Sequence, residues 1–213
     1  MPTLTRPWRQ PINPFFYFNG FNSAIADDYS DNPKIVAVAD YAERRGYRFV
    51  PVSICFRRAR EHAGDVLGMV GDTADAAVFC GSSMGGWFAR IVQLMLADAR
   101  PEIKTAAIAF NPAYDLSMYG HLLLGKQHNH VTHEDYLWTV DHSNRLRELE
   151  TGVRYGSERP FFVYLDKGDE VIGWERSAAR HDPISRLIVF EGGCHSFDHF
   201  HEALADFDSA FGG

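Results

Sequence analysis

Cysteine is scarce in this sequence, and it lacks long apolar runs. Three cysteines among 213 residues, Cys55, Cys80 and Cys194, are too few for a disulfide framework, and the first two lie in or near apolar segments. No apolar run approaches membrane-spanning length. Residues Met1 to Pro14 carry arginines and prolines but no apolar core of a signal peptide. The sequence therefore predicts a cytoplasmic protein.

A positive net charge is also missing. Against 21 lysine and arginine residues the chain has 28 aspartates and glutamates, which gives a net charge of −7 at pH 7. Nucleic acids and anionic membranes attract basic proteins, so neither is expected as a main partner. The sequence has no internal repeat, low-complexity tract or linker. We therefore expect one domain over residues 1–213 with a sizeable core, since 46% of the residues are hydrophobic.

Short apolar segments alternate with amphipathic ones along most of the chain. Near-continuous apolar runs are typical of strands buried on both faces, and their alternation with helices indicates a parallel sheet covered on both sides. The predicted fold class is therefore α/β, with a six-stranded, mainly parallel sheet. The predicted strands cover residues 15–18, 47–53, 76–80, 104–110, 160–166 and 186–191, and the predicted helices cover residues 33–45, 57–71, 85–99 and 199–211.

One stretch, residues 111–159, breaks the alternation. It is too long for a simple connection between two strands and too structured for a linker. In enzymes, segments of this kind are usually lids or caps. We expect a cap insertion at about residues 111–159 of the domain.

A serine-centred motif directly follows the third predicted strand. Residues 81–86 read Gly-Ser-Ser-Met-Gly-Gly, and the strand-turn-helix context is that of the Gly-x-Ser-x-Gly nucleophile elbow of α/β-hydrolases. The strained turn admits only very small residues two positions before and after the serine. Ser83 has Gly81 and Gly85 at those positions, whereas Ser82 has larger neighbours. Ser83 is therefore the predicted nucleophile, beside the positive end of the following helix.

Loops after two later strands supply a candidate base and acid. An acyl-transfer serine needs a base within hydrogen-bond reach, and the base needs an orienting carboxylate. His195 follows the last predicted strand on a Gly-Gly loop, and Asp169 follows the strand before it, in the chain order of α/β-hydrolases. Asp169 is preferred over Glu170, which would point away, and over Asp166, which is expected to end the strand. We predict Asp169 as the acid and His195 as the base.

The loop after the first predicted strand is the candidate oxyanion loop. A developing oxyanion needs two main-chain N–H donors. One donor is expected from Met84, the residue after the nucleophile. The other is expected from the loop Asn19-Gly20-Phe21-Asn22, with Phe21 as the donor. Asn19, Gly20 and Asn22 are predicted to contact the substrate.

Together these motifs resemble the YqiA/YcfP-like esterase family of small bacterial α/β-hydrolases. Residues 19–23 are similar to the family's His-Gly-Phe-Asn-Ser, and residues 81–87 to its Gly-Ser-Ser-Leu-Gly-Gly-aromatic elbow. Residues 110–113 are similar to its Asn-Pro-Ala segment, and residues 168–171 and 191–197 to its acid and histidine loops. The resemblance therefore extends over most of the chain.

The resemblance implies a Ser83–His195–Asp169 triad and esterase or thioesterase activity on acyl substrates, with no cofactor. It also implies an α/β-hydrolase sheet with the strand order 2-1-3-4-5-6. Asn19 departs from the family, which has histidine there, and Cys194 replaces a residue that is often asparagine. Because the oxyanion donors belong to the main chain, the change at Asn19 affects the substrate more than the reaction. The resemblance thus predicts the chemistry and leaves the acyl group open.

Aromatic residues near the motifs are candidates for an acyl pocket. Trp87 directly follows the elbow, and Tyr114 follows the fourth predicted strand. Both are predicted to contact the substrate, although ordinary core packing is the alternative.

Histidines cluster in the predicted cap. His128, His130 and His133 have spacings seen in some zinc sites, but no cysteine or carboxylate set completes four ligands. We expect a polar cap without a metal. His199 and His201 are expected on the surface of the last helix.

Two other functions share this pattern. An acyltransferase would pass the same acyl-enzyme to an alcohol, amine or thiol instead of water. A binding module would keep the scaffold without catalysis, and the change at Asn19 is the one feature that favours it. The interpretation that we prefer is a serine hydrolase acting on esters or thioesters of small to medium acyl groups, with a small molecule as its partner.

Overall fold

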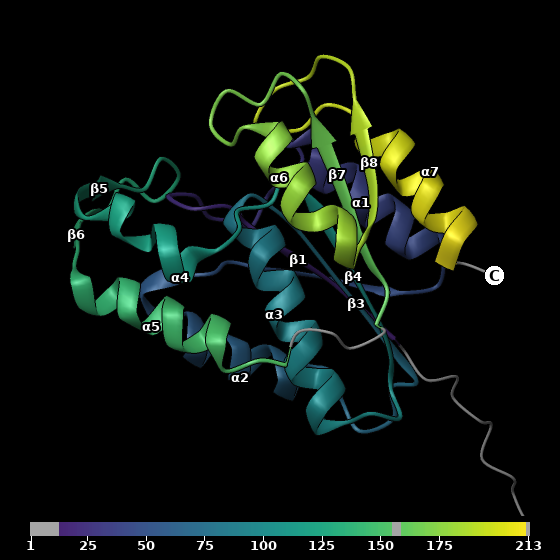
Figure 1. The fold of residues 1–213 in the computed structure, drawn as a ribbon. Helices are drawn as coiled ribbons and strands as arrows, with labels where there is room; N and C mark the ends of the chain where they lie inside the picture. Colours follow the sequence, from purple (N-terminus) through teal and green to yellow (C-terminus); the bar gives the residue numbers. More distant parts are fainter. Residues whose placement is uncertain (1–12, 155–158, 212–213) are drawn as a thin grey trace, which may run out of the picture.

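A six-stranded sheet forms the centre of the molecule (Figure 1). In this computed structural model, which describes residues 13–154 and 159–211, all neighbouring strands of the sheet are parallel. Their order, β2-β1-β3-β4-β7-β8, is the one expected from the sequence, and the predicted fold class is confirmed. The strands are β1 (Pro14–Phe18), β2 (Arg48–Val52), β3 (Ala76–Ser82), β4 (Lys104–Phe110), β7 (Phe161–Asp166) and β8 (Arg186–Phe190).

Helices cover both faces of the sheet (Figure 1). They are α1 (Pro33–Arg44), α2 (Ala59–Met69), α3 (Met84–Ala99), α6 (Trp174–His181) and α7 (Phe200–Phe211). α1 and α7 share a core with Phe15 and Tyr17 of β1, whereas α2 and α3 share another with Phe16 and Phe18. Alternate side chains of one strand thus enter two cores, which explains its continuous apolar sequence. No helix in these described ranges is long and apolar enough to cross a membrane.

Local signals set most helix boundaries. Asn32 caps α1, because its side-chain oxygen accepts the Ile35 N–H at 3.2 Å, and Gly46 follows the helix with φ of +76°. The predicted helix over residues 57–71 is confirmed as a short 3₁₀ turn, η1 (Phe56–Arg58), followed by α2. α6 and the 3₁₀ turn η3 (Asp182–Ile184) were not predicted. The reason is that α6 is mostly polar and buries only Ser177 and His181.

The segment between β4 and β7 has its own secondary structure. It contains α4 (Leu116–Tyr119), the 3₁₀ turn η2 (Gly120–Leu123), an antiparallel hairpin of β5 (Gly125–His128) and β6 (Asp135–Trp138), and α5 (Val140–Thr151). Residues 155–158 of the predicted insertion lie outside the described residues. Trp138, Leu146 and Leu149 are buried in the same core as α2 and α3. The insertion therefore packs on the face of the sheet that α2 and α3 cover.

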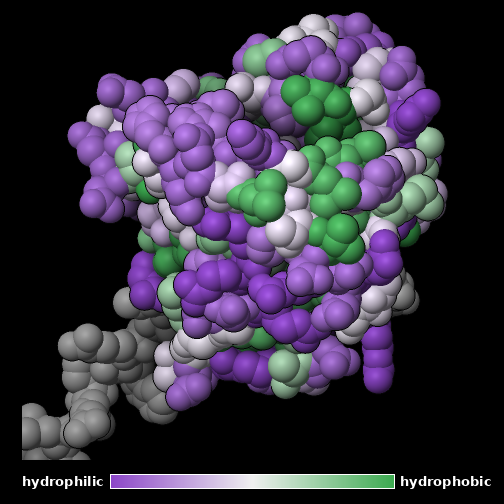
Figure 2. Space-filling view, turned by 90° about the vertical axis from the view of Figure 1, so that its left-hand side faces the viewer, coloured by the Kyte–Doolittle hydropathy of each residue, from purple (hydrophilic) through white to green (hydrophobic). Residues whose placement is uncertain are grey.

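The outer surface of this insertion is mixed in character. It faces the viewer in Figure 2, where apolar residues interrupt a mainly hydrophilic surface. Its exposed large apolar side chains are Met118, Tyr119, Leu122, Leu124, Val131, Leu137 and Val140. These side chains lie outside the shared core, so the insertion has an apolar inner side and a partly apolar outer side.

A buried carboxylate ties the insertion to the elbow helix. Glu150 of α5 accepts the indole N–H of Trp87 at 2.8 Å and the main-chain N–H groups of Leu116 and Ser117 at 3.2 and 2.6 Å. Both Glu150 and Trp87 are buried. Three donors from two other helices therefore depend on one acidic side chain.

Replacing this carboxylate by its amide is expected to destabilise the fold. Glu150→Gln keeps the size of the side chain but turns one of two acceptor oxygens into a donor that faces a donor. We expect the free energy of unfolding to fall by roughly 1.5–3 kcal/mol in urea denaturation. Glu148→Gln, an exposed change on the same helix, is the matched control and is expected to stay within about 0.5 kcal/mol of the parent protein. Equal stability of the two variants would contradict the inference that the Glu150 hydrogen bonds stabilise the packing of the insertion on α3.

Candidate active site

The candidate nucleophile lies at a strained turn between β3 and α3. Ser83 has φ of 54° and ψ of −125°, outside the regions that non-glycine residues usually occupy. A Cβ on Gly81 would come closer than 3.0 Å to the backbone of Gly85, and a Cβ on Gly85 would come that close to the backbone of Phe18. The two glycines of the motif are therefore required by close backbone packing around the serine.

The two adjacent serines have different surroundings. Ser82 is the last residue of β3, is buried, and shares a hydrogen bond of 3.0 Å with the Tyr17 hydroxyl. Ser83 is half-buried and occupies the apex of the turn. The position at the apex of the turn favours Ser83 over Ser82 as the candidate nucleophile.

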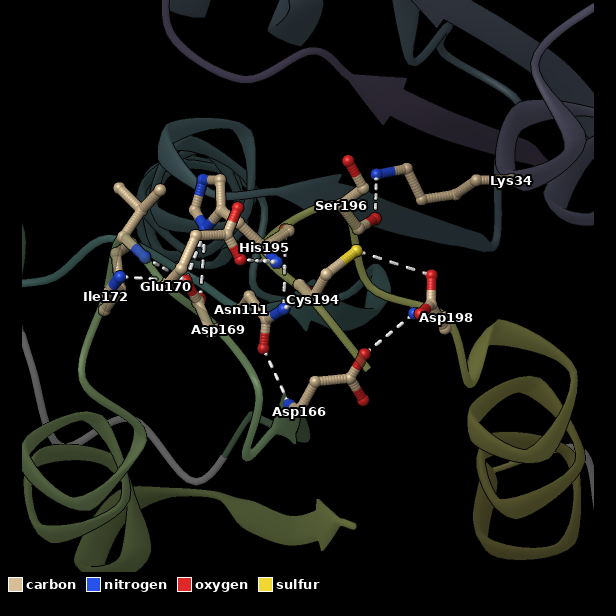
Figure 3. A network of polar contacts seen from close by, with 11 residues as sticks. Lys34, Asn111, Asp166, Asp169, Glu170, Ile172, Cys194, His195, Ser196 and Asp198 are labelled. Atoms are coloured by element: carbon tan, nitrogen blue, oxygen red, sulfur yellow. Dashed lines mark hydrogen bonds and ion pairs between the residues drawn. The ribbon is translucent and has the colours of Figure 1, made fainter. Parts of the chain in front are cut away.

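The candidate acid and base are paired (Figure 3). His195 Nδ1 lies 2.9 Å from Asp169 Oδ1 and 3.0 Å from Oδ2. The Asp169 side chain is only 2% exposed, and its Oδ1 also accepts the N–H groups of Val171 and Ile172, each at 2.8 Å. These bonds satisfy the buried carboxylate and hold the ring of His195 in one orientation.

The three candidate residues meet at one edge of the sheet. Ser83, Asp169 and His195 follow β3, β7 and β8, and the carboxyl ends of parallel strands lie at the same edge. Ser83 and His195 line a common hollow of about 200 Å³. Within the described residues no hydrogen bond joins their side chains. Such bonds are often loose before substrate is bound.

Two further side chains hold the histidine loop in place (Figure 3). Glu170 accepts the main-chain N–H of His195 at 2.9 Å, and this bond lowers the pKa of Glu170. Asn111 donates to the main-chain oxygens of Cys194 and His195 at 2.9 and 3.4 Å and accepts the N–H of Asp166 at 2.8 Å. Glu170 thus contacts the main chain of His195 and supports the loop, while Asp169 is paired with the ring. These supporting contacts were not predicted.

A second carboxylate–histidine pair lies beside the first. Asp166 is fully buried, with Oδ1 2.7 Å from Nδ1 of His199 and Oδ2 accepting the N–H of Asp198 at 2.8 Å. The ring of His199 stacks on Phe190, with centroids 4.7 Å apart. The expectation that His199 lies on the surface of the last helix is wrong, because it precedes α7 and is anchored by Asp166. Asp166 joins the end of β7 to the start of α7.

The candidate oxyanion loop approaches the nucleophile closely. A Cβ on Gly20 would lie 3.4 Å from Ser83 Cβ and 4.0 Å from its Oγ. Phe21 follows Gly20, and Met84 follows Ser83 at the start of α3. Among the described residues, no hydrogen bond uses the main-chain N–H of either Phe21 or Met84. Both donors are therefore available, and their role in binding an oxyanion stays a prediction.

Other residues predicted to contact substrate have protein partners. Asn19 is buried; its amide group donates to the main-chain oxygens of Gly20 and Ser23 at 2.8 and 2.7 Å, and its oxygen accepts the Ile54 N–H at 2.6 Å. Asn19 still lines the hollow beside Ser83. These hydrogen bonds of the Asn19 side chain thus help to fix the conformation of the candidate oxyanion loop.

Asn22 is held by the insertion. Its side-chain nitrogen donates to Gln127 at 2.8 Å, its side-chain oxygen accepts the Tyr136 hydroxyl, and its main-chain oxygen accepts the His130 N–H at 2.9 Å. Asn22 lines a cavity between the insertion and the loop after β2, not the hollow beside Ser83. The hairpin therefore braces the end of the candidate oxyanion loop.

Trp87 and Tyr114 also lie apart from the nucleophile. Both line a small cavity between α3, α6 and the insertion, together with Glu150 and His181, and neither lines the hollow beside Ser83. Their predicted contact with substrate remains a prediction. The hollow beside Ser83 includes instead a residue that was not predicted, Lys34. No motif in the sequence marks this lysine.

The histidines of the insertion are engaged in local contacts. His128 Nδ1 lies 2.7 Å from Asp135, and the rings of His130 and His133 lie 5.5 and 6.0 Å from that of His128. In residues 13–154 and 159–211, no three or more histidine, cysteine or acidic side chains are grouped so as to hold a metal ion.

Comparisons with known proteins identify the family. The sequence matches the uncharacterised protein family UPF0227 over residues 15–210, so the chain belongs to that family. This match confirms the relationship inferred from the motifs. Among curated protein sequences, none matches the chain.

Solved structures show the same architecture. Est1E from Butyrivibrio proteoclasticus has a TM-score of 0.68 and 19% identity, covering 95% of this chain and 89% of that one. Alpha/beta hydrolase domain-containing protein 10 from mouse has a TM-score of 0.63 and 21% identity, with coverages of 93% and 89%. A putative hydrolase from Agrobacterium vitis S4 has a TM-score of 0.65 and 14% identity, with coverages of 95% and 90%. These similarities establish the α/β-hydrolase fold.

Proposed function

We propose that this protein is a serine hydrolase that cleaves carboxylic ester or thioester bonds of small to medium acyl substrates. The observation that carries the proposal is the shared hollow of Ser83 and His195, with His195 paired at 2.9 Å to the buried carboxylate of Asp169. The strained turn at Ser83 supports the same role. Structures described as an esterase domain and as hydrolases share the fold.

In the first half-reaction Ser83 Oγ attacks the acyl carbonyl carbon. His195 Nε2 accepts the hydroxyl proton as the Oγ–carbon bond forms, and Asp169 stabilises the resulting imidazolium. The main-chain N–H groups of Phe21 and Met84 bind the oxyanion. The tetrahedral intermediate then expels the alcohol or thiol, which takes the proton from His195, and Ser83 is left acylated.

Water completes the cycle in the second half-reaction. His195 removes a proton from the water as its oxygen attacks the acyl carbon, and the proton then passes to Ser83 Oγ as the acid leaves. The chemistry uses no cofactor. We place the reaction in the cytoplasm, because Cys55, Cys80 and Cys194 are free thiols.

Covalent labelling tests the proposal directly. A fluorophosphonate probe reacts with a serine whose base and oxyanion donors are in place. We expect one adduct per chain by intact mass, located on Ser83 by peptide mapping, together with turnover of p-nitrophenyl esters and acyl thioesters of short and medium chain length.

Variants of the two adjacent serines provide the control. Ser83→Ala is expected to abolish both the adduct and turnover, whereas Ser82→Ala is expected to keep the adduct on Ser83. The absence of labelling in folded wild-type protein, or full turnover by Ser83→Ala, would refute the proposed mechanism.

A further inference from the structure

A lysine of α1 contacts the loop of the candidate base (Figure 3). Lys34 lies in the first turn of α1, and its side chain lines the same hollow as Ser83 and His195. Its Nζ donates to the main-chain oxygen of Ser196 at 2.6 Å. Ser196 directly follows the candidate base, so Lys34 contacts the loop that carries His195.

The Lys34 ammonium is incompletely satisfied by the protein. It has three donors, and in the described part of the chain the Ser196 oxygen is its single hydrogen-bond acceptor and no carboxylate lies within ion-pair distance of it. Burial lowers the pKa of Lys34 to about 8. A half-buried ammonium with two donors that the protein does not use, in the hollow that Ser83 and His195 line, is suited to bind an anionic ligand.

The neighbouring acidic groups are already engaged. Asp166 binds His199 and the Asp198 N–H, and Asp198 lies 3.5 Å from the thiol of Cys194. These two carboxylates lie beyond hydrogen-bond distance of Lys34. Their negative charges favour the protonated form of the ammonium. They leave the two free donors of the ammonium directed at the hollow or at solvent.

We propose that Lys34 binds a carboxylate group carried by the substrate, so that the enzyme prefers esters or thioesters that are anionic near the scissile carbonyl. This proposal rests on the proposed hydrolase function. A hollow of about 200 Å³ suits a short acyl or alcohol portion, and Lys34 is the one cationic side chain among the residues that line it, apart from the candidate base. A charge-assisted bond to a carboxylate would satisfy the free donors.

Pairs of esters that differ only in charge test this proposal. In the first pair, mono-p-nitrophenyl glutarate carries a carboxylate on its acyl side, and its methyl-capped diester is the neutral partner. In the second pair, 4-(butyryloxy)benzoate carries the carboxylate on its leaving group, and its methyl ester is the neutral partner. The quantity compared is the ratio of kcat/KM for the anionic ester to that for its neutral partner, corrected for spontaneous hydrolysis. In at least one pair, Lys34→Met is expected to lower this ratio by roughly tenfold or more, and Lys34→Arg to retain most of it.

A distant lysine provides the charge control. Lys104 is exposed at the first residue of β4, at the other end of the sheet, and Lys104→Met removes the same charge. This control variant is expected to keep the wild-type ratio. If Lys34→Met lowers kcat/KM for both members of each pair equally, Lys34 only supports the Ser196 loop and the proposal is overturned. Loss of all activity in Ser83→Ala tests the hydrolase function separately, because it does not depend on the ratio.

The preference is also expected to depend on pH. Lys34 is charged below its pKa of about 8 and neutral above it, so the ratio is expected to be high at pH 7 and to fall as the pH rises through 8. Any change that affects the two esters of a pair equally cancels in the ratio. A ratio that stays constant from pH 7 to pH 9.5 in the wild type would contradict the assignment. The other titratable groups that face Lys34 are Cys80 of β3, Asp166 of β7, and Cys194 and Asp198 before α7.

Discussion

Asp169→Asn is expected to lower kcat for ester hydrolysis by roughly four orders of magnitude while leaving the protein folded. The amide keeps the shape of the side chain, and its oxygen still accepts the N–H groups of Val171 and Ile172. Its nitrogen, however, is a donor that faces the Nδ1 atom of His195. The ring then adopts the tautomer that carries its proton on Nε2, where it cannot accept a proton from Ser83. Single-turnover kinetics with a p-nitrophenyl ester measures this loss.

The neighbouring pair of Asp166 and His199 provides a matched control. Asp166→Asn also removes a buried carboxylate that contacts a histidine, but that carboxylate binds the start of α7 instead of the candidate base. We expect Asp166→Asn to lower the free energy of unfolding by roughly 1–3 kcal/mol and to reduce kcat much less than Asp169→Asn. Equal losses of kcat in the two variants would show that Asp169 has no special role.

The sheet could be predicted because its strands carry their own signal. β1 is buried at all five positions, and β3 and β4 are buried at nearly all of theirs, so each reads as a continuous apolar run. The insertion lacks such a signal. β5 and β6 have four residues each and are largely exposed, and α5 is mainly polar. Their positions depend on contacts with α2, α3 and the candidate oxyanion loop, which are distant in the sequence.

The residues of the candidate site likewise fall into two groups, those that a sequence motif marks and those that no motif marks. Its proposed reacting residues follow strands in recognisable local motifs, which the strained turn at Ser83 and the close approach of glycines require. The supporting residues have no local motif. Asn111 contacts a residue 84 positions away, and Lys34 contacts one 162 positions away. Such roles follow from the folded arrangement of the strand ends, and a single sequence does not display them.

The insertion also limits how the site can adapt to substrate. Glu150 ties it to the elbow helix, and the hairpin holds Asn22 at the end of the candidate oxyanion loop. Trp138 packs edge-on against Phe21, with ring centroids 5.2 Å apart. Because the same segment packs in the core and contacts the loop, we infer that it acts as a fixed brace for Phe21.

Gly85→Ala is expected to damage stability and activity together. A Cβ at this position would lie closer than 3.0 Å to the main-chain oxygens of Phe18 and Asn19, which are backbone atoms and cannot rotate away. The end of β1 would have to move, and it carries the loop that contains Gly20 and Phe21. We expect the free energy of unfolding to fall by roughly 3 kcal/mol or more in urea denaturation. We also expect fluorophosphonate labelling of the remaining folded protein to slow at least tenfold.

Gly64→Ala separates this steric effect from the general cost of changing a glycine. Gly64 lies in α2, is exposed, and a Cβ there would meet nothing within 4 Å. Since alanine favours helices more than glycine does, this variant is expected to gain about 0.5–1 kcal/mol and to keep wild-type labelling. If Gly85→Ala were as stable as Gly64→Ala, the elbow would have room for a side chain. The inference that close backbone packing positions Ser83 against the candidate oxyanion loop would then be wrong.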